Sequence, residues 1–459
     1  MQAAAKYAAG VSYSPWVLRC LFHPLVLVWP VMKAGVLAGA SDPGSFDFLA
    51  ALPTLFFSSL SVALVALLAR RWGWPISTAL AAAFLYGVAW LPLAYGASPY
   101  PRPISTALLL AAFVLATSER RPSAACLAAG ALAGAAFAVR WSEGAVLLPL
   151  VAWTWWRYGD LRRCAALLAG FAAGAFLCAG LVDWLTWGTP FASLFAFVRI
   201  MWLEIPDARL AREKGFVWYL YSILRWLGPI LLLLILYGAR IRRYRPALVL
   251  GAGIVILMSC FAHKEWRYLQ AAVPFLAMAA AGGWERLRER GLRAVAAAAL
   301  LLSLPYGLER ASATLGDRVA SGLAAARYVR AMRPPPRVLA LEQTWAYGEH
   351  LWLGNAVEIR EIEYNKPFRA GAIRQAAAGA DVVGAYAQHV DRASLEELAA
   401  LGFRPLVSFP RVRSFECSLF GRGAFAPRAP RQRNGASETA APARWTPLAS
   451  TIPRAPETP

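Results

Sequence analysis

The sequence predicts an α-helical polytopic membrane protein with a small α/β appendage outside the membrane, towards its C-terminal end. Two observations predict this fold class. Of the 459 residues, 59% are hydrophobic and only 16% are charged, and the apolar residues gather into runs of roughly the 20 residues that cross a bilayer. The mean hydropathy of +0.46 agrees with both. A soluble chain of this length would form two or three domains, which this composition excludes.

Residues 1–47 are expected to form a segment at the outer membrane surface. Their apolar stretch, residues 17–40, is interrupted by Arg19, His23, Lys33 and two prolines, so it is either a poor membrane span or an amphipathic segment at the interface. No cleavable signal peptide is expected. The N-terminus lacks a basic segment followed by an apolar run and a small-residue cleavage site.

Residues 48–310 are expected to form a multi-span membrane domain. Its candidate spans are residues 48–69, 75–97, 103–118, 123–139, 144–156, 164–182, 219–238, 246–262, 268–283 and 294–309. Each is an apolar run near the length that crosses hydrocarbon, and the fifth is the shortest.

The loops between these spans sort by charge into two alternating sets. Arginine clusters occupy every second loop, at residues 70–71, 120–121, 157–163, 240–245 and 286–293. Basic residues favour the cytoplasmic side of a membrane. These loops are therefore predicted to be cytoplasmic, and the intervening loops are predicted to face outward.

This topology also explains the formal charge of +21, which therefore does not indicate nucleic-acid binding. The six cysteines are scattered singly, with no CxxC pair, and no group of residues has the spacing of metal ligands. Neither a metal nor another cofactor is expected.

The turn at residues 263–268, between two apolar runs, is the strongest candidate for a functional site. It holds His263, Lys264, Glu265 and Arg267, and ionisable groups are costly to place at a bilayer edge. Lysine and arginine can bind a phosphate, while a carboxylate can orient a hydroxyl or take its proton. The structural alternative is anchoring, in which cationic side chains reach lipid phosphates at the ends of spans.

Further residues of the outward loops are expected near this turn, namely Arg102, Arg140, Glu143, Asp183, Trp187, Glu204 and Asp207. Arg140 and Glu143 stand three residues apart, so an internal ion pair on a helix is an equal alternative to a binding role. Asp183 is expected to open the longest outward loop, and the alternative for it is a helix cap. The alternative for Trp187 is an interfacial anchor.

Residues 320–420 are expected to form the small α/β domain on the outer face. Residues 337–341 and 381–385 have strand patterns, and residues 394–401 have a helical pattern. Residues 424–459 are rich in Pro, Ala and Arg with almost no large apolar residues, so a disordered tail is expected.

The sequence His263-Lys264-Glu265-Trp266-Arg267-Tyr268 resembles the His-Lys-Glu-x-Arg-Phe/Tyr motif of glycosyltransferase family 22. These enzymes are the GT-C α-mannosyltransferases of N-glycan and GPI-anchor assembly, together with bacterial relatives. Shorter matches follow in the family's order, at residues 13–24, 100–102, 140–141, 183–188 and 218–220. The resemblance covers roughly residues 10–300.

This resemblance implies a GT-C-like membrane domain and an inverting glycosyltransferase. The enzyme would transfer a sugar, with mannose expected, from a polyprenyl-phosphate donor to a glycan or lipid-linked acceptor, on the outer face of a bacterial cell membrane. Its partners would be that donor, that acceptor and membrane lipids. Together with the charge pattern, the resemblance assigns donor phosphate binding to His263, Lys264, Arg267 and Arg102, substrate binding to Arg140, Glu143, Trp187 and Tyr219, and catalysis to Glu265 and Asp183.

Two other functions stay open: a different GT-C transferase, modifying lipid A or protein, and a lipid-linked-sugar transporter or flippase. A transporter places its binding residues near the midplane on broken helices, often in repeated halves. Here the charges lie at one edge and no repeat is evident, which favours a transferase.

Members of this family carry an acidic pair in the first outer loop, directly after a first membrane span. Residues 1–12 contain no carboxylate, so we expect that the chain starts within that loop or that its catalytic base comes from elsewhere. Asp42 and Asp47 are nearby but do not occupy the motif position. An inactive chain is the third possibility.

Overall fold

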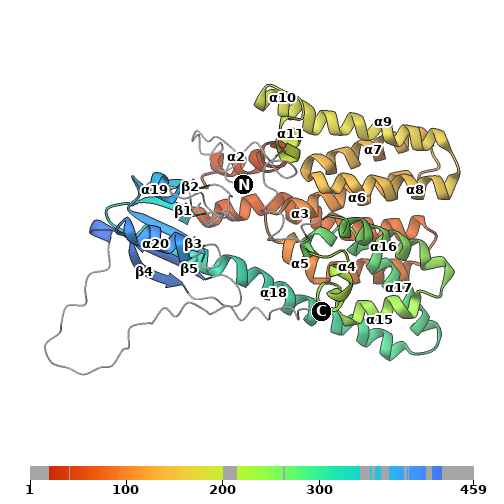
Figure 1. Cartoon of the computed structure of the whole chain (residues 1–459). Coiled ribbons are helices and arrows are strands. Elements are labelled where there is room, and N and C mark those ends of the chain that lie inside the picture. Colours follow the sequence, from red (N-terminus) through yellow and green to blue (C-terminus); the bar gives the residue numbers. More distant parts are fainter. Residues whose placement is uncertain are drawn as a thin grey trace, which may run out of the picture.

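Antiparallel helices form a bundle, and the last helix of the bundle continues into a five-stranded sheet (Figure 1). This computed structural model describes residues 20–40, 42–199, 214–261, 264–341, 352–353, 357–362, 372–386, 390, 392–409 and 416–425. Several predicted features lie outside these ranges: His263, Glu204, Asp207 and residues 426–459 of the expected tail.

The first half of the bundle runs from η1 to α11. Its elements are η1 (Phe22–Val28), α2 (Trp29–Leu37), α3 (Pro43–Arg71), α4 (Ile76–Gly87), α5 (Trp90–Gly96), α6 (Pro101–Ala116), α7 (Pro122–Val139), η2 (Trp141–Val146), α8 (Leu147–Tyr158), α9 (Leu161–Ala175), η3 (Phe176–Gly180), α10 (Leu181–Trp187) and α11 (Ala192–Arg199). Local sequence sets several starts. The Asp42 carboxylate accepts a hydrogen bond from the Ser45 amide at 3.0 Å before α3, and Asp160 caps α9 through the Arg162 amide at 2.9 Å.

The second half contains α13 (Trp218–Tyr221), α14 (Ile223–Trp226), α15 (Pro229–Gly238), η5 (Arg242–Tyr244), α16 (Arg245–Ser259), η6 (Trp266–Leu269), α17 (Val273–Glu289) and α18 (Arg293–Ala331). Proline in the first turn of α15, α16 and α17 fits the helix start, where no intrahelical partner exists for its missing N–H.

The structure divides several predicted spans differently from the sequence pattern. Within the described residues, four helices are long and apolar enough to cross a membrane, namely Gly44–Arg71, Pro122–Val139, Leu161–Trp187 and Arg293–Thr314. The predicted span 75–97 is the pair α4 and α5, bent by 59°. The predicted span 219–238 is interrupted between α13, α14 and α15.

Backbone contacts accompany these interruptions. A Cβ added at Gly307 of α18 would stand 1.8 Å from the Val88 carbonyl oxygen, at the bend between α4 and α5. Only glycine allows α18 to come this close. Pro229 begins α15 directly after Gly228, whose φ of +87° favours glycine. Apolar composition does not reveal such interruptions, so the sequence predicted continuous spans.

Helices α7 and α9 pack against each other through glycines. A Cβ added at Gly170 of α9 would stand 2.0 Å from the Leu127 carbonyl oxygen, and a Cβ at Gly130 of α7 would stand 2.0 Å from the Leu167 carbonyl oxygen. Another glycine follows one turn further along each helix and makes a similar contact. Small residues at this spacing let membrane helices approach backbone to backbone.

We predict that Gly170→Ala lowers the thermal unfolding midpoint of the detergent-solubilised protein. The added methyl group would force α7 and α9 apart, at a cost of about 1–3 kcal/mol for overpacking. The matched control is Gly253→Ala in α16, because nothing lies within 4 Å of a Cβ at that position. An unchanged midpoint for Gly170→Ala would contradict this packing.

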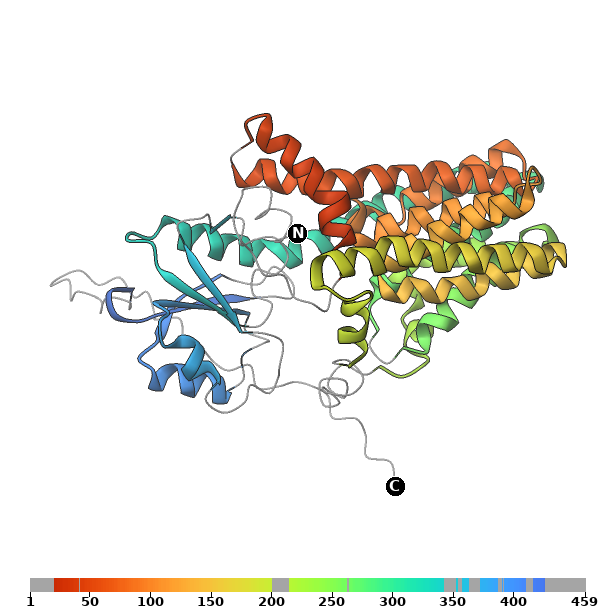
Figure 2. The ribbon, with the colours of Figure 1, turned by 90° about the horizontal axis from the view of Figure 1, so that it is seen from above.

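The turns between helices gather at two opposite ends of the bundle (Figure 2). At the end far from the sheet, arginine-bearing turns lie together: Arg243 donates a hydrogen bond to the Gly73 carbonyl, and the rings of Trp74 and Tyr244 meet edge to face, 4.6 Å apart. The turns after α5, α7 and α16 lie at the other end, beside the sheet. The two sets of loops that charge distinguishes are therefore the two ends of the bundle.

Helix α18 joins the bundle to the appendage without a break. It contains 39 residues, about 58 Å at the α-helical rise and roughly twice the thickness of a hydrocarbon core. The boundary expected between residues 310 and 320 therefore falls inside a helix. Near its C-terminal end, Ala325, Ala326 and Val329 pack against the sheet.

The appendage is a mixed sheet with strand order β2-β1-β3-β5-β4. β1 (Arg337–Leu341) pairs in parallel with β2 (Glu358–Ile362) and β3 (Val382–Tyr386), and β5 (Cys417–Gly421) pairs antiparallel with β3 and β4 (Arg404–Phe409). Helix α18 packs on one face, and α19 (Ala372–Ala377) and α20 (Arg392–Ala400) pack on the other. The strand patterns correspond to β1 and β3, and the helical pattern corresponds to α20.

Trp352 of the appendage contacts the bundle directly. Its indole Nε1 donates a hydrogen bond to the Asp47 carboxylate, near the start of α3, at 2.5 Å. The Arg327 guanidinium of α18 lies 4.4 Å from the centre of its ring. These contacts hold the sheet beside the end of the bundle where the outward-predicted turns lie.

Candidate functional site

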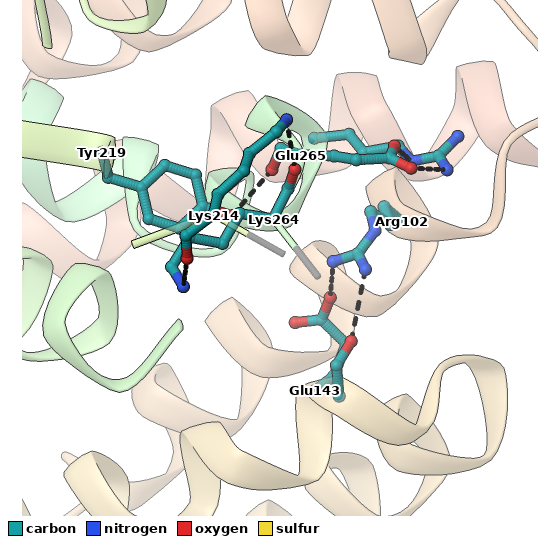
Figure 3. A network of polar contacts seen from close by, with 8 residues as sticks. Arg102, Glu143, Lys214, Tyr219, Lys264 and Glu265 are labelled. Carbon is teal, nitrogen blue, oxygen red and sulfur yellow. Dashed lines mark hydrogen bonds and ion pairs between the residues drawn. The ribbon is translucent and has the colours of Figure 1, made fainter. Parts of the chain in front are cut away.

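Four cationic and two carboxylate side chains converge at the end of the bundle beside the appendage (Figure 3). They are Arg102 in the first turn of α6, Glu143 in η2, Lys214 before α13, and Lys264, Glu265 and Arg267 at the start of η6. Because α6, η2, α13 and η6 all begin at this end, residues far apart in the sequence meet there. Tyr268 joins the group, since its ring lies 4.1 Å from the Arg102 guanidinium carbon and 6.0 Å from that of Arg267.

Arg102 and Glu143 form a buried ion pair. Arg102 Nη1 lies 2.7 Å from Glu143 Oε1, and both side chains are 1% exposed. Arg102 Nη2 also donates a hydrogen bond to the Ser142 hydroxyl at 3.2 Å. Desolvated charges are strongly destabilising unless paired. This pair therefore fixes α6 against η2, next to the Tyr268 ring.

This pairing changes the interpretation of three predicted residues. The alternative of an ion pair between Arg140 and Glu143 is wrong, because Glu143 pairs with Arg102 instead. Arg140 has extended backbone, with φ −157° and ψ 116°, before the 3-10 helix η2, so the two residues do not share an α-helical face. The described contacts of Arg102, predicted to bind phosphate, and of Glu143, predicted to bind substrate, are those of structural support.

Lys264 and Lys214 each bind the backbone of the other. Lys264 Nζ donates hydrogen bonds to the Lys214 and Phe261 carbonyls at 2.7 and 2.6 Å, and Lys214 Nζ donates one to the Lys264 carbonyl at 2.8 Å. Lys264 is 2% exposed, whereas Lys214 is only partly buried. Burial lowers the pKa of Lys214; the Glu265 carboxylate opposes this shift and the Lys264 ammonium adds to it.

Glu265 pairs with Arg267 within the same turn. Arg267 Nη2 donates a hydrogen bond to Glu265 Oε1 at 2.6 Å, and Arg267 Nε contacts the second carboxylate oxygen. The Glu265 side chain is 25% exposed and that of Arg267 is 13% exposed, so this pair reaches the surface of the site. Tyr219, predicted to bind substrate, is fully buried, and its hydroxyl donates to the Glu265 backbone carbonyl at 2.9 Å.

Tryptophan rings line the site next to α13. Trp218 and Trp266 stack with ring centroids 6.0 Å apart, and Trp90 meets Trp266 edge to face at 5.8 Å. The Lys214 Nζ lies 3.9 Å from the centre of the Trp218 ring. A hollow of about 210 Å³ opens on the same rings and is lined by Trp218, Tyr221, Ser222, Arg225 and Trp266.

The described contacts of Asp183 and Trp187 do not join them to this cluster. The sequence predicts that Asp183 opens a loop, but Asp183 lies inside α10, fully buried, because the helix that begins with α9 continues to Gly188, where φ is +77°. Asp183 Oδ2 accepts hydrogen bonds from the Ser193 amide and hydroxyl at 2.9 and 2.5 Å. The indole N–H of Trp187 has no partner among the described residues.

Lys214 is the residue that sequence reasoning missed. It lies 50 residues before Lys264, outside the motif and outside the local matches, and no periodic pattern distinguishes it from other lysines at a loop end. Its only sequence signal is its position shortly before the match that begins at Trp218.

We predict that Glu143→Ala destabilises the protein by about 3–5 kcal/mol, because it leaves the buried Arg102 guanidinium unpaired. The double variant Arg102→Leu/Glu143→Leu should recover most of this loss, since it removes both charges. Thermal unfolding in detergent measures both effects. Glu396→Ala, which breaks the exposed pair with Arg392, is the control and should change the midpoint little. Equal midpoints for Glu143→Ala and the unmodified protein would rule out a buried pair.

Comparison with protein families matches residues 13–315 to the Alg9-like mannosyltransferase family. The chain belongs to this family. The match covers more than half of the chain and includes all six residues of the charge cluster. The matched residues therefore belong to a glycosyltransferase family, while β1 to β5 lie beyond them.

Comparison of structures finds the same fold in ArnT from Cupriavidus metallidurans, both in the apo state and bound to undecaprenyl phosphate. The TM-scores are 0.60 and 0.58, and the sequence identity is 15% in both cases. Each comparison covers 92% of this chain, with 92% and 93% of the respective ArnT chains. The protein thus has a GT-C-like fold. No curated protein matches the chain significantly in sequence.

Proposed function

We propose that this chain transfers a sugar, with mannose as the expected one, from a polyprenyl-phosphate donor to an extracytoplasmic glycan or lipid-linked acceptor. Family membership supports sugar transfer. The likeness to ArnT, which has been crystallised with undecaprenyl phosphate, supports the class of donor. The observation that carries the proposal is the cluster of Lys214, Lys264, Glu265 and Arg267 at one end of an apolar bundle.

The position of this cluster suits a lipid phosphate. A polyprenyl chain lies in hydrocarbon, so its phosphate must meet the protein at the bilayer edge, where the helices of the bundle end. An ammonium group binds a phosphate as a point charge, and a guanidinium binds it as a planar fork. Lys264 and Arg267 thereby stabilise the negative charge that develops on the phosphate as it leaves. His263 is expected to take part in the same contact.

The transfer forms one bond and breaks one bond at the anomeric carbon. The acceptor hydroxyl oxygen attacks this carbon, the bond from the carbon to the phosphate oxygen breaks, and the configuration inverts. A carboxylate takes the proton of the hydroxyl, and polyprenyl phosphate departs. Of the two predicted catalytic residues, Glu265 is the better placed, because it is 25% exposed within the cluster, whereas Asp183 is fully buried.

The proposed location is the extracytoplasmic face of a bacterial cell membrane. The arginine-bearing turns gather at the opposite end of the bundle, and basic turns favour the cytoplasm. The cluster and the sheet would then both face outward. Arg140 and Trp187, partly buried at the outward end, stay predictions for contact with the acceptor.

We predict that membranes containing this chain release polyprenyl phosphate from radiolabelled polyprenyl-phosphate mannose. Lys264→Ala and Arg267→Ala should each lower this rate roughly 10- to 100-fold, because a hydrogen bond to a charged group contributes about 1.5–3 kcal/mol. Thin-layer chromatography of the extracted lipid measures the release.

The control for this experiment is Arg290→Ala, which removes a cation at the opposite end of the bundle and should leave the rate unchanged. Protease protection of the sheet, measured in the same membranes, reports on insertion. Failure of the unmodified chain to release polyprenyl phosphate would contradict the transfer. Loss of insertion in the Lys264→Ala and Arg267→Ala variants would instead support a role in anchoring.

A further inference from the structure

Lys214 lies at the end of the segment that precedes α13, and it makes two contacts with the motif region. Its ammonium group donates a hydrogen bond to the Lys264 carbonyl at 2.8 Å and lies 3.9 Å from the centre of the Trp218 ring. The Lys264 ammonium donates a hydrogen bond to the Lys214 carbonyl at 2.7 Å. Each lysine therefore fixes the backbone that carries the other.

This arrangement gathers positive charge. The six described side chains of the cluster carry four cations and two carboxylates. Arg102 pairs with Glu143, and Arg267 pairs with Glu265, so the two lysines supply the positive excess of the six. The two ammonium groups lie at opposite ends of the lysine pair (Figure 3). Gathering positive charge at a partly buried site costs electrostatic energy, and an anion bound beside Lys214 would offset that cost.

The two lysines differ in how they can meet a ligand. Lys264 is 2% exposed, and its ammonium is held by two carbonyls. Lys214 is only partly buried, and its ammonium has three N–H donors. Within the described part of the chain, one hydrogen bond uses one of these donors. The ring beneath it, Trp218, also forms a wall of the hollow of about 210 Å³.

We propose that Lys214 binds the phosphate group of the lipid donor directly, with Lys264 placing it there through their shared backbone contact. This inference rests on the proposed function and adds a binding residue that lies outside the His-Lys-Glu motif. The Trp218 ring holds the Lys214 ammonium by a cation–π contact, and the N–H groups that do not bond the Lys264 carbonyl would bind the phosphate. Lys264 then acts in part as the residue that positions Lys214.

Direct binding tests this role without catalysis. The full chain, purified in detergent, is titrated with undecaprenyl phosphate and separately with undecaprenol, which has the same chain and no phosphate, and complexes are counted by native mass spectrometry. Lys214→Met, which keeps the aliphatic stem, should weaken undecaprenyl phosphate binding roughly tenfold, as expected for a lost charged hydrogen bond. It should leave undecaprenol binding unchanged. Lys214→Arg should retain most of the preference for phosphate.

The matched control is Lys33→Ala, which removes a lysine from α2, an element that carries none of the six cluster residues, and should bind both lipids normally. If the unmodified chain binds the two lipids equally, the proposal that the donor is a polyprenyl phosphate is contradicted. If the unmodified chain prefers undecaprenyl phosphate and Lys214→Met keeps the same preference, only the inference about Lys214 fails. If the Lys214→Met and Lys214→Arg variants both unfold, Lys214 stabilises the fold and the inference is overturned.

Discussion

A backbone that enters hydrocarbon must satisfy all its N–H and C=O groups internally, and the rest of this structure follows from that constraint. The chain crosses as helices, so ionisable side chains collect where helices begin and end. Glycine contacts, as between α7 and α9, let neighbouring helices pack backbone to backbone. Arg102, Glu143, Lys214 and Lys264 therefore become neighbours, although their segments are far apart in the sequence. The extension of α18 beyond the bundle places the sheet at the same end.

The two ion pairs of this end have different physical roles. The pair of Arg102 and Glu143 is buried. Water does not solvate these two charges, so each is stabilised by the other, and the pair maintains the geometry of α6 and η2. The pair of Glu265 and Arg267 is partly exposed. Separating these two side chains so that each can bind a ligand therefore costs less free energy than separating the buried pair. The lysines add charge to a turn that the Tyr219 hydroxyl and the Trp218 ring hold in place.

Local pattern predicted those features that depend on local composition. Apolar runs predicted the helical membrane class, arginine clusters predicted one end of the bundle, and short strand-like apolar runs predicted β1 and β3. Features that depend on distant residues were not predictable in this way. The bend between α4 and α5 is packed against Gly307, the partner of Glu143 depends on η2 being a 3-10 helix, and the role of Lys214 depends on a carbonyl 50 residues away. Asp183 was misplaced because the helix continued past the end of its apolar run.

The central claim is that the charged end beside the sheet receives the phosphate of a lipid donor. An electron cryomicroscopy structure of the full chain with undecaprenyl phosphate would test this claim most directly. The account predicts density for the phosphate within hydrogen-bonding distance of Lys214 or Arg267, with the polyprenyl chain leading from there along the apolar helices. A phosphate bound instead at the arginine-bearing turns of the opposite end would contradict the account.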